Sequence, residues 1–109
     1  MSAPKKIRIL VADDHFVVRM GLVALVSTED DLEVIGQACC GNEAVEQFEK
    51  LKPDLVLMDL RMPHKDGIAA TREILARHPH ARILMLTTYD GDTDIHRAIE
   101  AGAQGYVLK

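Results

Sequence analysis

Short apolar runs alternate along this chain with segments in which apolar residues recur every three or four positions. We expect strands at residues 7–12, 32–38, 54–59, 82–88 and 105–109. Three of these runs are almost continuously apolar, which is typical of parallel strands covered on both faces. We expect helices between them at residues 16–26, 44–51, 68–76 and 95–101. The alternation predicts an α/β domain with a doubly wound, parallel, five-stranded sheet and right-handed crossovers.

Residues that favour helix ends lie between these segments. We expect N-caps at Asn42, at Asp66 and at Asp92 or Thr93. Gly102 is expected to end the last helix, because glycine adopts positive φ without steric cost.

Composition narrows the class of protein. The 109 residues have an ordinary balance of 48% apolar and 28% charged residues and fit one domain. A net charge of −4 argues against nucleic-acid binding by residues 1–109 alone. No apolar run approaches the length of about 20 residues that a membrane span needs. The adjacent Cys39 and Cys40 form neither a disulfide framework nor a metal-binding pair, so we expect a reduced, cytoplasmic setting, with Cys39 buried and Cys40 exposed.

Polar and charged residues follow the apolar part of four predicted strands. They are Asp13 and Asp14, Asp59, Thr87 and Thr88, and Lys109. The carboxyl ends of parallel strands meet at one edge of the sheet, where open α/β sheets place their ligand chemistry. We therefore expect these side chains to converge.

Charge repulsion among the three carboxylates predicts a bound cation. Two carboxylates about 4 Å apart repel each other by about 4 kcal/mol at an effective dielectric constant of about 20. Mg²⁺ prefers oxygen ligands, is usually held by one or two carboxylates, and keeps positions open for phosphate oxygens. One Mg²⁺ and the Lys109 ammonium balance the charge of three carboxylates. These carboxylates and Lys109 therefore predict a Mg²⁺-dependent site that binds a phosphoryl group.

Asp59 is the predicted acceptor of that group, because it stands alone at the end of the central strand and a carboxylate can form an acyl phosphate. The Thr87 hydroxyl is expected to sense the phosphoryl oxygens. Taken singly, each residue has an ordinary structural alternative. Asp13 and Asp14 could cap the helix that begins near His15, and an aspartate at a strand end is usually a turn residue. Their joint placement favours the phosphoryl site.

Four motifs resemble the receiver domain of bacterial two-component response regulators. They are "VADDH", "LVLMDLRMPHKDG", "ILMLTT" and "AGAQGYVLK", and they occur in the expected order over nearly the whole chain. "ADDHFVVRMGL" and "GYVLK" are similar to the NarL/FixJ-type subfamily, which carries a LuxR-type helix-turn-helix domain after the receiver. The resemblance implies the flavodoxin-like strand order 2-1-3-4-5.

The resemblance also implies roles for individual residues. Asp59 would accept a phosphoryl group from a sensor histidine kinase. Asp14 would bind Mg²⁺ directly and Asp13 mostly through water, with Asp59 and the backbone carbonyl of Arg61 as further ligands. Thr87 would be the switch hydroxyl, Lys109 would pair with the phosphate, and Tyr106 would be the aromatic switch residue.

The chain departs from the family pattern at its end, because the fifth helix that normally follows Lys109 is missing. We expect its loss to uncover an apolar face and to favour self-association, and a homodimer is the expected state. In the intact protein we expect a DNA-binding domain after the receiver, so that DNA would be bound only through that domain.

These roles describe a phosphorylation switch. We do not expect the protein to be an enzyme beyond phosphotransfer to itself and autodephosphorylation. Two other functions compete with this interpretation. One is a Mg²⁺-dependent phosphohydrolase with an aspartyl-phosphate intermediate, but the general acid expected two residues after its strand-one nucleophile is absent here, since His15 follows Asp13 and Phe16 follows Asp14. The other is a receiver that signals without phosphate, which the complete acid set disfavours. We expect His15 to open the first helix rather than to bind metal.

Overall fold

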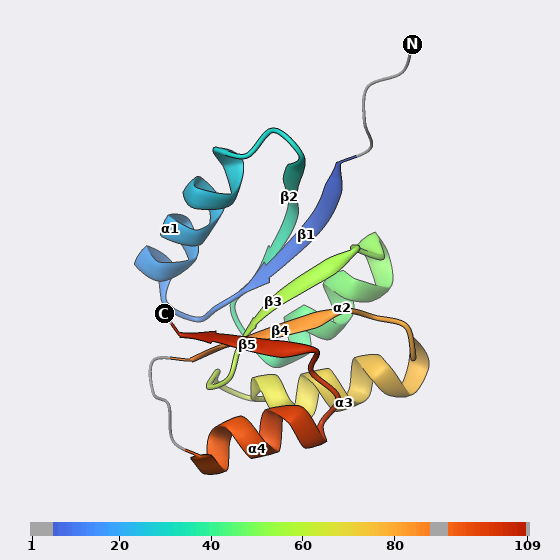
Figure 1. The fold of residues 1–109 in the computed structure, drawn as a ribbon. Helices are drawn as coiled ribbons and strands as arrows, with labels where there is room; N and C mark the ends of the chain where they lie inside the picture. The colour runs from blue at the N-terminus through green and yellow to red at the C-terminus, as the bar shows by residue number, and fades with distance from the viewer. Residues whose placement is uncertain (1–5, 88–91, 109) are drawn as a thin grey trace.

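The computed structural model describes residues 6–87 and 92–108, which fold around one sheet of parallel strands (Figure 1). The strands are β1 (Ile7–Ala12), β2 (Leu32–Ala38), β3 (Leu55–Asp59), β4 (Ile83–Thr87) and β5 (Gly105–Leu108). Their order in the sheet is β2-β1-β3-β4-β5, and each neighbouring pair is parallel. The predicted α/β class and parallel sheet are confirmed.

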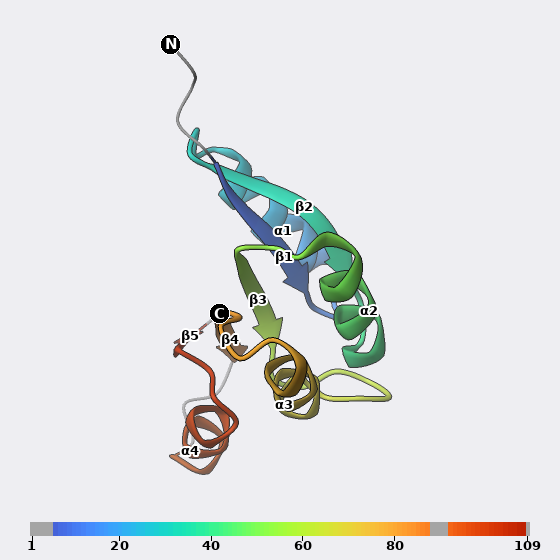
Figure 2. The same cartoon turned by 90° about the vertical axis from the view of Figure 1, so that its right-hand side faces the viewer.

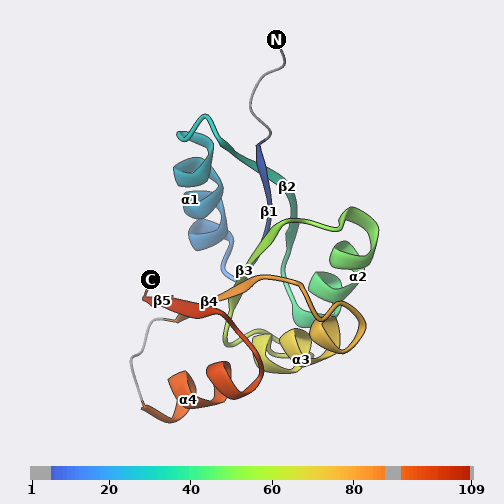
Figure 3. The ribbon, with the colours of Figure 1, turned by 45° about the vertical axis from the view of Figure 1, so that its right-hand side comes forward.

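Four helices in the described part of the chain connect the strands. They are α1 (Phe16–Ser27), α2 (Gly41–Leu51), α3 (Gly67–Arg77) and α4 (Asp92–Glu100). Figure 2 shows α1 behind β1 and β2, whereas α2, α3 and α4 lie on the other side of the sheet. The turned view in Figure 3 separates the same two layers.

Alternation along β1 divides the core between the two faces. Ile9 and Val11 are buried together with Val26 of α1. Leu10 and Ala12 point to the opposite face and join the larger core cluster beneath the other helices. Both faces of β1 are therefore apolar, which explains why the run from Ile9 to Ala12 is continuously apolar in sequence.

Two predicted helix starts are wrong by three residues. The helix α2 begins at Gly41 with Cys40 as its N-cap, so Asn42 lies inside the helix. The helix α4 begins at Asp92, so Asp92 and Thr93 are helical residues rather than caps. Both errors have one cause, because the first turn of each helix is polar and carries no apolar periodicity. Asp66 is confirmed as an N-cap, since its side chain accepts a hydrogen bond from Ala69 N.

The helix α1 is apolar on nearly every side. It buries only Val26 fully, and its residues Phe16, Val17 and Leu25 are 65%, 80% and 67% exposed. At 12 residues it is far too short to span a bilayer, and none of the other described helices combines the length and apolarity for that either.

Gly102 ends α4 through two hydrogen bonds. Its own N–H donates to Ile99 O at 3.0 Å, and Ala103 N–H donates to Ala98 O at 3.1 Å. This pair of bonds forms a Schellman motif, which requires a left-handed residue at the position that Gly102 occupies with φ of +105°. The predicted role of Gly102 is confirmed.

Alanine substitutions at two glycines should change stability in opposite directions. Gly102→Ala should lower the free energy of unfolding by about 1–2 kcal/mol, because an L-residue is strained at this φ. Gly21→Ala should raise it by about 0.5–1 kcal/mol, since alanine favours the helix and the new methyl group meets nothing within 4 Å. Urea unfolding followed by circular dichroism measures both changes, and shifts of the same sign would contradict this assignment.

Candidate functional site

The carboxyl ends of β1 and β3 bring three acidic side chains together. Ala12 pairs with Met58, so Asp13 follows β1 at the level where Asp59 ends β3. Potential ligand atoms of Asp13, Asp14, His15 and Asp59 all lie within 4.8 Å of one another. We call these four residues the acidic cluster.

Backbone hydrogen bonds fix the two strand ends that carry the acidic cluster. Asp13 N–H donates to Ala38 O of β2 at 3.0 Å, and Leu60 N–H donates to Leu86 O of β4 at 2.9 Å. Asp13 thus follows β1 directly and Asp59 ends β3, and both strands are hydrogen-bonded to their neighbours up to these positions. The sheet register therefore brings the acidic side chains together, although their like charges repel each other.

The carboxylates of the cluster are largely removed from water. Asp13 is fully buried, Asp59 is 4% exposed, and the side chain of Asp14 is 29% exposed. Asp13 Oδ1 accepts a hydrogen bond from His15 N–H at 2.9 Å, which fixes one carboxylate oxygen at the start of α1. Asp14 Oδ1 is buried and accepts no hydrogen bond from the described residues, although His15 Nδ1 lies 3.2 Å away.

These residues fit a divalent cation. Burying a carboxylate is costly unless positive charge or hydrogen bonds compensate for the lost water. Oxygen atoms from several carboxylates at one partly open site are the donor set that hard divalent ions prefer. The acidic cluster could therefore hold a metal ion, as the predicted set of Asp13, Asp14 and Asp59 requires.

Arg19 of α1 holds the loop that carries Asp13 and Asp14. Its Nη1 donates to the backbone oxygen of Asp13 at 2.8 Å, and its Nε donates to Gln37 Oε1 at 3.1 Å. Arg19 therefore bridges the end of β1, the start of α1 and the strand β2. Arg19 was not among the site residues predicted from the sequence, where its one signal is its place four residues after His15, on the first turns of the helix.

Two glycines at helix starts, Gly67 in α3 and Gly41 in α2, let the loop between β3 and α3 pack closely against its neighbours. A Cβ atom on Gly67 would lie 2.0 Å from the backbone oxygen of Asp59, and one on Gly41 would lie 2.0 Å from the backbone oxygen of Lys65. Gly41 N–H donates to that same Lys65 oxygen at 2.9 Å, which ties the loop to the start of α2. Glycine is therefore required at both positions for the loop to pack against β3 and against the start of α2.

An ion pair joins this loop to α3. Lys65 Nζ lies 2.5 Å from Glu73 Oε2, and both side chains are partly exposed. The hydrogen bond from the Lys65 ammonium lowers the pKa of Glu73, and the positive charge of Lys65 acts in the same direction against the effect of partial burial.

Of the other predicted site residues, one ends β4, one lies within β5, one follows β3, and the others lie outside the described part of the chain. Thr87 ends β4, and Tyr106 pairs with Met85 across β4 and β5, but the side chains of Thr87 and Tyr106 lie outside the described residues. Thr88 and Lys109 also lie outside them. Arg61 follows β3 by two residues, and the role of its carbonyl as a metal ligand stays a prediction.

Two further predictions concern His15 and Cys39, which lie near the ends of β1 and β2. His15 opens α1 as its N-cap, as predicted, but its ring also lies among the potential ligands of the cluster. The expected burial of Cys39 is wrong, because Ala38 is the last buried residue of β2 and Cys39 is exposed while Cys40 is half-buried. A hydrogen bond from the Cys39 thiol to Glu43 raises the pKa of Cys39, which disfavours the reactive thiolate.

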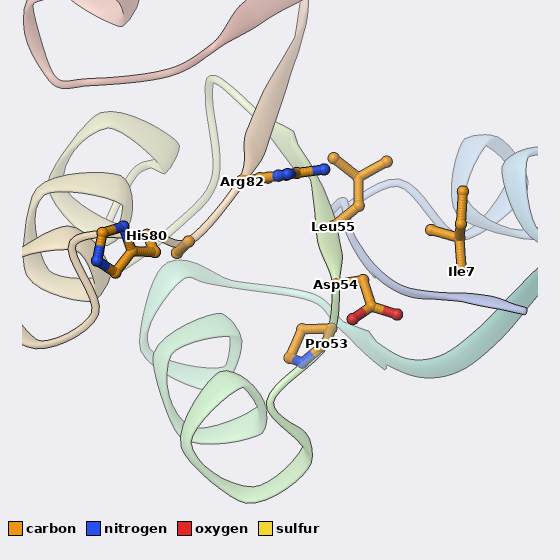
Figure 4. A pocket seen from close by; sticks show the side chains of 7 residues that line it. Ile7, Pro53, Asp54, Leu55, His80 and Arg82 are labelled. Carbon is orange, nitrogen blue, oxygen red and sulfur yellow. The ribbon is translucent and has the colours of Figure 1, made fainter. Parts of the chain in front are cut away.

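A pocket of about 520 Å³ lies at the opposite end of the strands (Figure 4). Its walls include Ile7 at the start of β1, Leu55 at the start of β3 and Arg82 just before β4. Because it opens at the amino ends of the strands, this pocket is separate from the acidic cluster and contains none of the predicted site residues.

A family profile described as response regulator receiver domain matches residues 9–109. The chain belongs to this family. It is similar to the response regulator protein VraR of Staphylococcus aureus, with 44% identity over 103 residues that cover 94% of this chain and 49% of that protein. The chain therefore spans about half the length of the curated relatives it matches.

Solved structures give the same assignment. A two-component response regulator of the LuxR family from Aurantimonas sp. SI85-9A1 matches with a TM-score of 0.92 and 39% identity, covering 96% of this chain and 75% of that chain. The signal receiver domain of a response regulator named NarL from Mycobacterium tuberculosis matches with a TM-score of 0.93 and 32% identity, covering 96% and 85%. The receiver domain described here is thus homologous to LuxR-family and NarL-type response regulators, as its motifs indicate.

The Lys65–Glu73 pair should make a pH-dependent contribution to stability. Because the pKa of Glu73 is lower in the folded state, its contribution is present above the unfolded pKa and is lost as pH falls through the folded pKa. Glu73→Gln should therefore be less stable than the unmodified chain at neutral pH, and the difference should vanish in acid. Chemical denaturation at a series of pH values measures this.

Glu46→Gln is the matched control, because Glu46 is exposed on α2 and takes part in no ion pair among the described residues. Its stability difference should stay near zero throughout the titration. A Glu73→Gln difference that persisted unchanged into acid would contradict the assignment.

Proposed function

We propose that the receiver domain is a phosphorylation switch whose acceptor is the Asp59 carboxylate. The observation that carries this proposal is the position of Asp59, which is buried at the end of β3 with a carboxylate oxygen within 4.8 Å of ligand atoms from Asp13 and Asp14. Membership in the response regulator receiver family supports it.

The chemistry follows from this arrangement. One oxygen of Asp59 forms a bond to phosphorus while the bond between phosphorus and the imidazole nitrogen of a sensor histidine kinase breaks, so that the imidazole leaves. Asp13, Asp14, Asp59 and the backbone carbonyl of Arg61 would hold Mg²⁺. When bound, Mg²⁺ neutralises charge on the phosphoryl oxygens.

Thr87, Tyr106 and Lys109 complete the proposed switch. Asp59 pairs with Leu86, so Thr87 lies one residue further along the neighbouring strand β4. The Thr87 hydroxyl would donate to a phosphoryl oxygen, and the Lys109 ammonium would pair with the phosphoryl charge. Tyr106 on β5 would be the aromatic switch residue, whose conformation changes on phosphorylation. The phosphorylated carboxylate carries more negative charge than the free carboxylate. It therefore favours the conformation in which the Thr87 hydroxyl and the Lys109 ammonium lie closest to it.

In the intact protein, we propose that the receiver controls a DNA-binding domain. A similar protein from Staphylococcus aureus is described as a LuxR-family DNA-binding response regulator, of which this chain covers 84% of the solved part at 25% identity. We infer that the switch acts in the cytoplasm, controls a C-terminal helix-turn-helix domain that binds DNA, and dimerises. The receiver itself would act on its own acyl phosphate and would not turn over external substrates.

Phosphorylation should depend on Asp59. With Mg²⁺ and acetyl phosphate, the chain should gain the mass of one phosphoryl group, and Asp59→Asn should gain none. Amide resonances near Thr87 and Tyr106 should shift with beryllofluoride in the unmodified chain only.

Asp54→Asn is the control, because it makes the same change at the residue just before β3, at the opposite end of the strand from Asp59. Asp54 lies next to the separate pocket, so this variant should respond like the unmodified chain. An undiminished response in Asp59→Asn would move the acceptor elsewhere, and steady hydrolysis of small phosphate esters would favour the phosphohydrolase.

Mg²⁺ should stabilise the fold through Asp14. At a concentration 100 times its dissociation constant, a ligand specific for the folded state adds about 2.7 kcal/mol to the free energy of unfolding. Asp14→Asn should lose most of this gain, yet it should be at least as stable as the unmodified chain without metal, because one repelling charge is gone. Thermal unfolding with Mg²⁺ and with EDTA tests both statements, and equal Mg²⁺ responses would contradict them.

A further inference from the structure

The His15 imidazole lies among the carboxylates as a potential nitrogen ligand. Its Nδ1 atom is 3.2 Å from Asp14 Oδ1 and 3.5 Å from Asp13 Oδ1. Two ligand atoms about 2.1 Å from one ion lie about 3.0 Å apart at a right angle and about 3.4 Å apart at a tetrahedral angle. The observed separations therefore match those of neighbouring ligands on a single ion.

The local structure places the backbone of His15 beside the acidic cluster. His15 is the N-cap of α1 with φ of −89° and ψ of 114°, and its backbone N–H donates to Asp13 Oδ1. The cap and this hydrogen bond fix the backbone. The side chain is 69% exposed, so the ring can turn toward the cluster without displacing any core side chain.

We propose that His15 sets the metal preference of the acidic cluster by adding a nitrogen ligand for late first-row divalent ions such as Co²⁺, Ni²⁺ or Zn²⁺. This inference rests on the proposed function, because it takes the same carboxylates as metal ligands.

The preference follows from ligand chemistry. Mg²⁺ favours carboxylate, carbonyl and water oxygens, whereas imidazole nitrogen suits Co²⁺, Ni²⁺ and Zn²⁺. A site of carboxylates alone gains little discrimination beyond the general order of affinities for divalent ions. Addition of the His15 nitrogen favours the later ions selectively, and these ions compete with Mg²⁺ for Asp13, Asp14 and Asp59.

The test compares Co²⁺ and Mg²⁺ affinities in the untagged chain and in two variants. His15→Asn and His15→Ser both supply favoured N-cap residues, so α1 keeps its start while the imidazole is lost. Isothermal titration with each metal alone should show the ratio of Co²⁺ to Mg²⁺ affinity falling by about tenfold or more in both variants. In the unmodified chain, the Co²⁺ complex should show a paramagnetically shifted imidazole N–H resonance that both variants lack.

His96→Asn is the matched control, because His96 is 74% exposed on α4 and pairs with Glu100, away from the cluster. It should leave the affinity ratio unchanged. A ratio that stays the same in both His15 variants, with Co²⁺ still competing with Mg²⁺, would overturn the role of His15 and leave the phosphorylation switch intact. A chain that binds neither ion and gains no phosphoryl group would overturn the proposed function as well.

Discussion

Repulsion among buried carboxylates is the constraint on which the site depends. Asp13 lies directly after β1 and Asp59 ends β3, and both strands are hydrogen-bonded to their neighbours in the sheet. The acids therefore cannot separate without breaking the register of β1 and β3. The fold thus holds these like charges close together. A divalent ion would reduce this repulsion and would also attract the negative oxygens of a phosphoryl group, which connects the architecture of the sheet to the proposed switch.

The surroundings of the acids are arranged to keep them in place. Arg19 fixes the loop after β1 from the helix side, while Gly67 lets the loop after β3 pack against the backbone of Asp59. Neither residue carries the chemistry. Each removes freedom from a segment that does, and so lowers the cost of bringing the carboxylates into one arrangement when a ligand binds.

The strands and the acid set could be predicted from the sequence because both leave periodic or positional signals. The run before Asp59 is apolar because β3 lies in the middle of the sheet, and its end marks the site. The starts of α2 and α4 were missed because a polar first turn has no such signal. The bridge from Arg19 to Asp13 and the place of the His15 ring depend on side-chain directions and on the crossover of α1. Local sequence does not encode these, and the tertiary fold decides them.

The most direct test of the proposed switch is a crystal structure of the chain with Mg²⁺ and beryllium fluoride. We expect one ion bound by Asp13, Asp14 and Asp59, with the fluoride adduct on an oxygen of Asp59. An adduct on another residue, or an ion bound away from these three acids, would contradict it.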